Sequence, residues 1–410
     1  MALAAEPPAR GRARYTCAPV SVRRSLPWLF VLASALALSE VLFYSALAPL
    51  LPHYAHRLHL SKGRAGLLTA SYAIGALAAS VPLGLAVARL GARRTAITSA
   101  FVLALTSLAF GFSQSAVTLD AARFTQGIAG SGVWIGALTW LVGAAPSRRR
   151  GEIVGGMLGI AIAGAMLGPV VGSLAQLSGT RTVFGAVAVA IALLGLIAAA
   201  TPGIDEQARR LERRALRGLL GDRRLLAGVC FTAIPASLFG VLNVLAPLRL
   251  SSAGVGSVAI GAVFLASAAL EGGASPVFGR LSDRLGPWSV IRIGLSSSAL
   301  LAFVLPLPDV AWLIAATTAL AGIAFGMSYV PASALMSSAA DSHELDHGLA
   351  YALWNLAWAL GVTLGSAVGA PLAQATSDEL PYWLLALVCL AGLLTTRRSS
   401  RRSAEIAGDG

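Results

Sequence analysis

The chain is 410 residues long, with 56% hydrophobic and 12% charged residues and a mean hydropathy of +0.75. A soluble domain carries about twice that share of charge, so the composition excludes a soluble protein and indicates a membrane protein. The net charge of +13 does not indicate a nucleic-acid-binding protein, because the basic residues lie between apolar stretches instead of on a solvated face. Three scattered cysteines, at positions 17, 230 and 389, exclude a disulfide framework.

The apolar stretches have the length that a membrane-spanning helix requires, which is roughly 20 residues. They predict an all-α, polytopic membrane protein with twelve spans, at residues 27–51, 66–88, 95–114, 117–144, 153–177, 182–201, 226–250, 256–281, 289–307, 311–336, 349–374 and 380–396. The first span is longer than the apolar core of a signal peptide, which is about 7 to 15 residues. We therefore expect the first span to remain in the protein.

The basic residues predict the orientation of the chain. Of the 31 Lys and Arg residues, 25 fall in the tails and the even-numbered turns. Five fall on the opposite face (Arg57, Lys62, Arg64, Arg181 and Arg249), and Arg123 lies inside a span. Because Lys and Arg are enriched in cytoplasmic loops, we expect a multi-pass protein of the plasma membrane with both termini cytoplasmic.

The longest polar interruption divides the chain into two groups of six spans. Residues 203–225 mix acids with arginine pairs at helical spacing, which is typical of an amphipathic linker on the membrane surface. We expect a cytoplasmic tail at 1–26, an N-terminal six-helix bundle at 27–202, the linker, a C-terminal six-helix bundle at 226–396 and a cytoplasmic tail at 397–410.

Three sequence matches indicate that the two groups are copies of one unit. LAPL at 47–50 recurs at 245–248, and GLAVARLG at 84–91 is echoed by GRLSDRLG at 279–286. The third match is a glycine run in span five that recurs in span eleven (Gly164, Gly168, Pro169 and Gly172; Gly361, Gly365, Ser366 and Gly369). Repeated bundles of this kind are a recurrent feature of secondary transporters, whose substrate site lies between the repeats.

The turn after span two resembles the signature G-x-x-x-D-R-x-G-R-R of the major facilitator superfamily. The matching residues are Gly84, Arg89, Gly91 and Arg93, whereas Ala88 and Ala92 replace the usual Asp and Arg. The second copy keeps the acid, as Gly279, Asp283, Arg284 and Gly286. In the family, this turn helps to hold one of two conformations.

Three further motifs are similar to signatures of the same family. Arg123, Gln126, Gly127 and Gly130 in span four resemble its R-x-x-Q-G motif. The glycine and proline run of span five is similar to the signature of its proton antiporters, and span one, with Glu40, Tyr44, Pro49 and Pro52, is like the first helix of its drug-export branch. The resemblance implies the major facilitator fold, two pseudo-symmetric six-helix bundles, and export in exchange for protons by a monomer without a cofactor.

Three formal charges lie deep within predicted spans: Glu40, Arg123 and Glu271. A charge at the centre of the bilayer costs about 2.5 to 3.5 kcal/mol on translocon scales, so each is a functional candidate. Desolvation disfavours the charged form of a carboxyl group, which favours loading and release of a proton. We expect Glu40 to carry the proton, Arg123 to set its proton affinity and Glu271 to face the cavity from the other half. The alternative is that both acids are protonated and bond neighbouring helices.

Span eleven presents a mixed aromatic and amide stripe (Tyr351, Trp354, Asn355 and Trp358) on one helical face. Such a stripe suits a cavity for amphipathic or cationic organic molecules, although packing explains it as well. Asn243 and Tyr44 are further cavity candidates. We expect the glycine run of span five to form a tight, kinked seam between the halves, because small residues let helices approach closely.

The sequence contains one enzyme-like motif, HELDH at 343–347, which fits the zinc-binding pattern H-E-x-x-H. It lies in a polar turn rather than within a span, at the place that Arg150-Gly151 occupies in the first repeat. The other histidines, His53, His56 and His59, belong to the opposite face. We therefore expect no metal site and no enzyme, and keep a membrane metalloprotease as a distant alternative.

The sequence thus predicts a secondary transporter that exports a small organic compound, a drug or a metabolite, in exchange for protons by alternating access. The alternatives of the same fold are a sugar or other metabolite exporter and a proton-coupled importer. The expected partners are a small-molecule substrate, protons and the lipid bilayer, and no nucleic acid.

Overall fold

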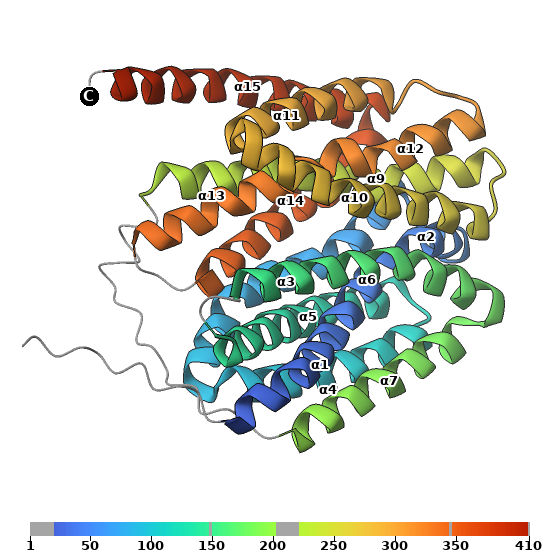
Figure 1. Ribbon diagram of the computed structural model, residues 1–410. Helices are drawn as coiled ribbons and strands as arrows, with labels where there is room; N and C mark the ends of the chain where they lie inside the picture. Colours follow the sequence, from blue (N-terminus) through green and yellow to red (C-terminus); the bar gives the residue numbers. More distant parts are fainter. Residues whose placement is uncertain (1–19, 147–149, 202–220, 344–346, 409–410) are drawn as a thin grey trace, which may run out of the picture.

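The computed structural model describes residues 20–146, 150–201, 221–343 and 347–408, and the chain in these ranges is helical throughout (Figure 1). The first half contains α1 (Val20–Ser45), α2 (Leu47–Arg57), α3 (Lys62–Leu90), α4 (Ala92–Phe112), α5 (Ala116–Ala144), α6 (Arg150–Ser178) and α7 (Thr180–Ala200). The second half contains α9 (Arg223–Ser252), α10 (Ser257–Leu285), α11 (Pro287–Val304), α12 (Ala311–Gly326), α13 (Tyr329–Ser342), α14 (His347–Ala375) and α15 (Glu379–Gly408).

Twelve candidate membrane spans are present among the described residues, which confirms the predicted number. Ten spans correspond to one helix each, and two are broken. The first span, Leu26–Arg57, is interrupted between α1 and α2, and the tenth, Ala311–Ser342, between α12 and α13. The sequence analysis expected continuous spans at both places.

A proline lies shortly after each interruption. Proline lacks an N–H group, and its ring clashes with the carbonyl four residues earlier. Pro49 lies four residues after Ser45, the last residue of α1. Pro331 lies four residues after Met327, which follows the end of α12. The two breaks therefore occur where a proline removes a helical hydrogen bond.

The helices form two bundles that lie one above the other in Figure 1, α1–α7 below (the N-terminal bundle) and α9–α15 above (the C-terminal bundle). The beginning of α1 and the C-terminus of the chain lie on the left in this view. We call this end of the molecule the termini face and the opposite end the far face. The last candidate span ends at Thr396, and α15 continues beyond it to Gly408, through most of the predicted C-terminal tail at 397–410.

Within each bundle, glycines bring helix backbones into contact, and the two bundles repeat these contacts. A Cβ atom added at Gly127 of α5 would meet the backbone oxygen of Tyr72 in α3, and one at Gly322 of α12 would meet that of Ser267 in α10. Likewise, α6 packs through Gly168 on Leu42 of α1, whereas α14 packs through its own glycines on α9. The internal repeat of the sequence is therefore a repeat of helix pairs.

The glycines of the span-five run pack on α1, and the proline of the run lies at the contact between the halves. Gly164, Gly168 and Gly172 contact α1 and its break, all within the N-terminal bundle. Pro169 of the same run takes part in the contact between the bundles, since a Cβ atom at Gly261 of α10 would lie 3.0 Å from its backbone oxygen. A helix presents several faces, and the sequence alone did not show which neighbour the glycines meet.

The two signature turns have the same backbone geometry. Gly91 links α3 to α4 with φ 88°, and Gly286 links α10 to α11 with φ 80°. Residues with a side chain rarely adopt this left-handed region. The glycine of each signature is therefore required by the turn itself.

The outer surface of the bundles is apolar. Large hydrophobic side chains on several helices are more than half exposed, among them Leu105, Val117, Leu177, Leu300, Trp312 and Leu394. Continuous exposure of such side chains is unfavourable in water but matches the hydrocarbon of a bilayer. The protein is a multi-pass membrane protein.

Several predictions fall on residues outside the described ranges. These are most of the N-terminal tail at 1–26, most of the linker at 203–225, two arginines of the run 148–150 and the central residues 344–346 of HELDH.

A substitution at Gly365 tests the close approach of α14 to α9. A Cβ atom at Gly365 would lie 2.0 Å from the backbone oxygen of Ser237, so Gly365→Val must push the two helices apart. Overpacking of this kind costs about 1 to 3 kcal/mol, and we expect a lower melting temperature in detergent, measured by intrinsic fluorescence.

The matched control is Gly273→Ala in α10, where an added Cβ atom meets nothing within 4 Å. We expect this variant to melt at or above the temperature of the unmodified protein, because alanine favours the helix over glycine. Equal melting temperatures of Gly365→Val and Gly273→Ala would contradict the packing described here.

Candidate functional site

A cavity of about 550 Å³ lies between the two bundles. Its walls come from α1, α2, α3, α5 and α6 of the N-terminal bundle and from α9, α10, α12, α13 and α14 of the C-terminal bundle. Most of its surface is apolar, and among its lining residues only Glu40 and Glu271 are ionisable acids. A largely apolar cavity with a few polar groups is typical of a site for a small organic molecule.

Glu40 lies at the wall of this cavity and is held by a tyrosine. The hydroxyl of Tyr72 in α3 donates a hydrogen bond to Oε1 of Glu40, with 2.5 Å between the two oxygens. Tyr72 is buried, so Glu40 is the partner that satisfies its hydroxyl. The bond fixes the carboxyl group at the surface of the cavity.

Arg123 lies behind Tyr72 and does not line the cavity. Its guanidinium carbon is 4.8 Å from the centre of the Tyr72 ring, and the side chain is only 2% exposed. Among the described residues it forms no ion pair with Glu40. A buried cation over an aromatic ring is attracted to the face of the ring. Arg123 therefore packs on the Tyr72 ring, and the hydroxyl of Tyr72 contacts Glu40.

The guanidinium of Arg123 also caps the break in the first span. Nη1 donates to the backbone oxygen of Phe43 at 2.8 Å, and Nη2 donates to that of Tyr44 at 3.3 Å. These carbonyls belong to the last turn of α1, where helical partners are lost. A cation is favourable at this end of a helix. One side chain thus stabilises the break and positions the ring that binds Glu40.

Glycines of α5 make room for this arrangement. A Cβ atom at Gly130 would lie 2.3 Å from the Tyr72 hydroxyl oxygen and 2.8 Å from Cγ of Glu40. The motif Arg123, Gln126, Gly127 and Gly130 therefore supplies both the cation and the space. Gln126 is buried, and its Oε1 accepts a bond of 3.4 Å from Arg123.

Glu271 lies on the opposite wall, in α10, and its surroundings differ. Its side chain rests on Gly326, where an added Cβ atom would lie 2.6 Å from Cγ of Glu271. No hydrogen bond or ion pair involves its carboxyl oxygens within the part of the chain that the structure describes. Gly326 is the last residue of α12, so the acid lies at the second break.

Aromatic side chains line the cavity in two separate groups. Nδ2 of Asn243 donates to the hydroxyl of Tyr44 at 3.2 Å, a bond between the bundles. The ring centre of Tyr44 is 4.9 Å from that of Trp358. On the side of Glu271, the ring centre of Tyr329 is 5.8 Å from that of Trp354.

The structure gathers most of the predicted site residues in one place. Glu40, Tyr44, Asn243, Glu271, Trp354, Asn355 and Trp358 all line the cavity, whereas Arg123 does not. The side chain of Tyr351 lies outside the described part of the structure. Sequence analysis missed Tyr72, Tyr329, Phe239 and Trp134. An aromatic residue in a span costs far less than a formal charge, so these residues carry no comparable signal in the sequence.

The cavity is closed toward the far face. There, Nζ of Lys62 in α3 forms an ion pair of 2.6 Å with Asp378, which follows α14. The backbone N–H of Gly63 donates to Oε1 of Gln374 at 2.8 Å, and Oγ of Ser173 donates to the backbone oxygen of Ser257 at 3.3 Å. All three contacts join the two bundles.

Toward the termini face the cavity continues between the helices. Its lining extends along α6 from Pro169 to Gly155, near the beginning of the helix, and along α10 from Phe264 to Pro276. It includes Ser333 of α13. The two bundles are thus joined at the far face, and the cavity extends toward the termini face.

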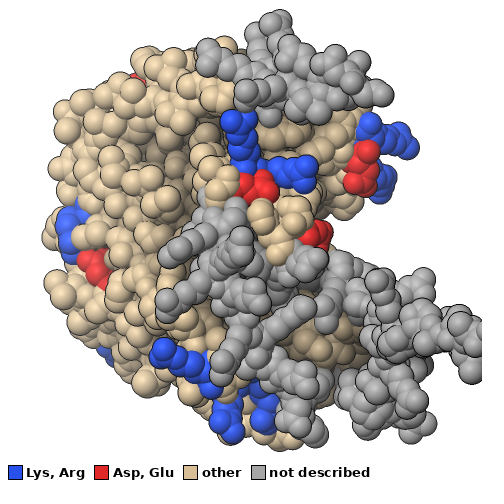
Figure 2. Space-filling model, turned by 90° about the vertical axis from the view of Figure 1, so that its left-hand side faces the viewer, with Lys and Arg blue, Asp and Glu red and all other residues tan. Residues whose placement is uncertain are grey.

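Basic side chains surround the termini face, onto which Figure 2 looks. The exposed residues there include Arg89, Arg94, Arg223, Arg224, Arg280 and Arg284. Arg93 donates to the backbone oxygen of Ala199 at 2.6 Å and so ties α4 to the end of α7. Asp283 is exposed, and no ion pair involves it among the described residues.

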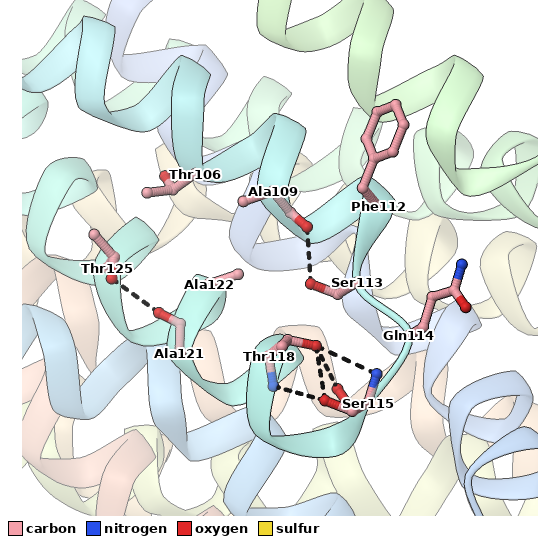
Figure 3. A pocket seen from close by; sticks show the side chains of 10 residues that line it. All are labelled: Thr106, Ala109, Phe112, Ser113, Gln114, Ser115, Thr118, Ala121, Ala122 and Thr125. Atoms are coloured by element: carbon pink, nitrogen blue, oxygen red, sulfur yellow. Dashed lines mark hydrogen bonds between the residues drawn. The ribbon is translucent and has the colours of Figure 1, made fainter.

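A second cavity, between α4 and α5 at the far face, is lined by no charged residue among those described (Figure 3). The hydroxyls of Ser113 and Thr125 donate to carbonyls of their own helices, and Ser115 and Thr118 cap α5 reciprocally. Because its hydroxyls are used locally and it carries no charge, we assign the functional site to the central cavity.

The described part of the HELDH segment gives no support to a metal site. Nε2 of His343 lies 3.4 Å from Oδ2 of Asp222, the residue that caps α9. No group of three metal-ligand residues occurs in the described ranges. Residues 344–346 lie outside them.

Comparison with known proteins gives a consistent result. The sequence profile of the Major Facilitator Superfamily matches residues 33–346. Two curated relatives, each an uncharacterized MFS-type transporter YcaD, come from Shigella flexneri serotype 5b (strain 8401) and Escherichia coli O45:K1 (strain S88 / ExPEC). Each is 26% identical over 385 residues, which is 91% of this chain and 96% of the relative.

Two solved structures share the fold at 14% sequence identity. The nucleoside transporter NupG matches with a TM-score of 0.69 over 90% of this chain and 98% of its own. A bacterial homolog of the human lysosomal transporter Spinster, inward-facing and occupied, matches with a TM-score of 0.74 over 91% and 97%.

The ion pair at the far face is the basis of a prediction. Lys62 and Asp378 are 42% and 19% exposed, and such a pair contributes about 1 kcal/mol or less. Asp378→Asn should raise the population of molecules with an open far face, and with it the labelling rate, by at most about fivefold. The measurement is the rate at which a membrane-impermeant maleimide, added on the far side, labels Ser45→Cys in a chain whose three native cysteines are replaced.

A matched pair within one bundle serves as the control. Arg64 and Asp120 have the same exposed fractions, 42% and 19%, and lie 2.8 Å apart, but both belong to the N-terminal bundle. We expect Asp120→Asn to leave the labelling rate unchanged. Equal effects of the two substitutions would contradict a specific role of the Lys62–Asp378 pair in closure.

Proposed function

The chain belongs to the major facilitator superfamily and is a membrane transporter rather than an enzyme, and we propose that it exports a small organic compound in exchange for protons. The observation that carries the proposal is the hydrogen bond between Tyr72 and Glu40 at the wall of the central cavity. It places a carboxyl group that can bind a proton next to the space that can bind a cargo.

The orientation follows from the charges. Lys and Arg are enriched in cytoplasmic loops, and the termini face is rich in exposed arginine. We assign this face to the cytoplasm, with both termini there, and the membrane to the plasma membrane. In this orientation the structure is the cytoplasm-facing state, in which a cargo for export would enter. The unit of transport is a monomer, because one chain holds the whole cavity.

We propose a transport cycle in which the proton and the cargo compete for the central cavity. We assign the exchanged proton to Glu40 and propose that Glu40 carries it when the cavity holds no cargo. Cargo binding favours loss of that proton, and Tyr72 then stabilises the carboxylate by donating its hydroxyl hydrogen. Arg123, over the Tyr72 ring, favours the charged form further. The proton and the cargo thus alternate, which is the requirement for antiport.

The contacts at the far face separate when the bundles rock. Lys62 and Asp378 then part, and the cytoplasmic ends of the helices come together. Asp283 and Arg284, in the second signature turn, are exposed in the present state and available for contacts in the other. This turn and its first copy, with Gly84, Arg89 and Gly91, are the elements that we assign to that switch.

The experiment uses everted membrane vesicles that contain the protein and a pH-sensitive dye. Tetraphenylphosphonium, uridine and lactose are added in turn to vesicles with an imposed proton gradient. We expect at least one of them to dissipate the gradient, since its entry must be coupled to proton exit. If the gradient instead dissipates only when the compound crosses the membrane in the same direction as the protons, the result would favour an importer of the same fold.

Replacement of Glu40 by Gln tests the proton carrier. Glu40→Gln keeps the volume of the side chain and removes the ionisable group, so cargo should no longer drive proton movement. Exchange of labelled for unlabelled cargo across the membrane needs no proton, and we expect this exchange to persist, which serves as the control for folding. Proton-coupled export at the normal rate in Glu40→Gln would refute the assignment.

Replacement of Tyr72 by Phe tests the hydrogen bond itself. Tyr72→Phe keeps the ring under Arg123 but removes the donor, and a bond to a charged group contributes about 1.5 to 3 kcal/mol. Glu40 should therefore bind its proton about tenfold or more tightly. We expect the pH at which export is half-maximal to move upward by about one unit or more, measured in the same vesicles. An unchanged pH profile would mean that Tyr72 only fills space.

A further inference from the structure

We propose that Glu271 and the aromatic wall beside it bind the positive charge of an organic cation, so that the cargo is a monovalent lipophilic cation. The inference rests on the proposed function, because it takes the central cavity as the transport site. It assigns the two acids of the cavity to different tasks, Glu40 to the proton and Glu271 to the cargo.

The first argument is the difference between the two carboxyl groups. Glu40 accepts a hydrogen bond from Tyr72. Both oxygens of Glu271 are without a hydrogen-bond partner within the described ranges, although the residue faces the cavity. An acid inside a protein is normally paired or hydrogen-bonded. A cation that enters the cavity would supply the missing partner.

The second argument is the aromatic wall that surrounds Glu271. Tyr329 and Trp354 lie with their ring centres 5.8 Å apart, and Phe239 stacks on Tyr329 at 6.2 Å. All three residues line the same cavity as Glu271. Faces of aromatic rings attract cations, and most strongly cations that carry organic substituents and few bound waters.

The third argument is the absence of competing positive charge. No Lys, Arg or His is among the residues that line the cavity in the described ranges. The nearest buried cation, Arg123, lies behind Tyr72 and is 2% exposed. An anionic cargo would thus face two acids without a basic partner, whereas a cation would meet favourable charge from both bundles.

Three hydrogen-bond donors near this wall could favour an anion instead. Nε1 of Trp354, Nδ2 of Asn355 and the hydroxyl of Tyr329 have no partner among the described residues. Each of these atoms exposes less than 1 Å² of surface, so a cargo in the cavity does not reach them in this conformation. Glu271 is the acidic residue that this wall of the cavity presents among the described residues.

The test compares two ions of the same shape and opposite charge, tetraphenylphosphonium and tetraphenylborate. Binding of each labelled ion to the purified full-length protein in detergent is measured by equilibrium dialysis. We expect the protein to bind the phosphonium more tightly than the borate. We expect Glu271→Gln to weaken phosphonium binding by about tenfold or more, as expected for the loss of a desolvated charge partner.

Two further variants separate the charge from the fold. Glu271→Asp keeps the negative charge and should retain most of the phosphonium affinity. Asp309→Asn removes an exposed acid of the same bundle and should change nothing. The inference is overturned if the protein does not bind the phosphonium, if it binds the borate as tightly, or if Glu271→Gln binds the phosphonium as the unmodified protein does.

The outcomes distinguish this inference from the proposed function. Vesicles that exchange uridine or lactose for protons, with no binding of the phosphonium, would refute the cationic cargo and leave antiport standing. Phosphonium binding that depends on Glu271, with no proton movement in vesicles, would refute antiport and leave the cation site standing.

Discussion

The hydrogen bond from Tyr72 to Glu40 is the interaction on which the rest of the site depends. A carboxyl group away from water needs a hydrogen-bond partner in each protonation state. The hydroxyl of Tyr72 can donate to the charged form and can accept from the protonated form. The ring of Tyr72 lies under Arg123, which caps the break of the first span. Gly127 and Gly130 of α5 leave the space for the tyrosine and the acid. The two glycines, the break in the first span, Arg123 and Glu40 are thus all in contact around Tyr72.

The two bundles repeat their helix contacts but differ in the chemistry they present to the cavity. In both, a glycine makes room for an acid, Gly130 of α5 for Glu40 and Gly326 at the end of α12 for Glu271. In the N-terminal bundle the acid is bound by a tyrosine, whereas in the C-terminal bundle it faces aromatic rings without a hydrogen-bond partner among the described residues. A duplicated scaffold with unequal acids suits a transporter that must bind two different cations in turn.

The sequence predicted the twelve spans and the cavity positions of Glu40, Glu271 and Trp358, because apolar length and buried charge have large energetic costs that leave clear patterns. It did not predict the partner of Glu40, since a tyrosine such as Tyr72 is tolerated anywhere in a span. It also did not show that the glycines around Gly168 pack on α1, whereas Pro169 of the same run contacts the other bundle. Periodicity identifies a small-residue face, but only the packed structure shows which helix covers that face.

The central claim is that cargo binding displaces the proton of Glu40. The most direct measurement is proton release by the purified protein in a weakly buffered solution with a pH indicator, on addition of tetraphenylphosphonium. The account predicts that the unmodified protein acidifies the solution on binding, and that Glu40→Gln binds the phosphonium without acidification. Binding without proton release by the unmodified protein, or equal release by Glu40→Gln, would contradict it.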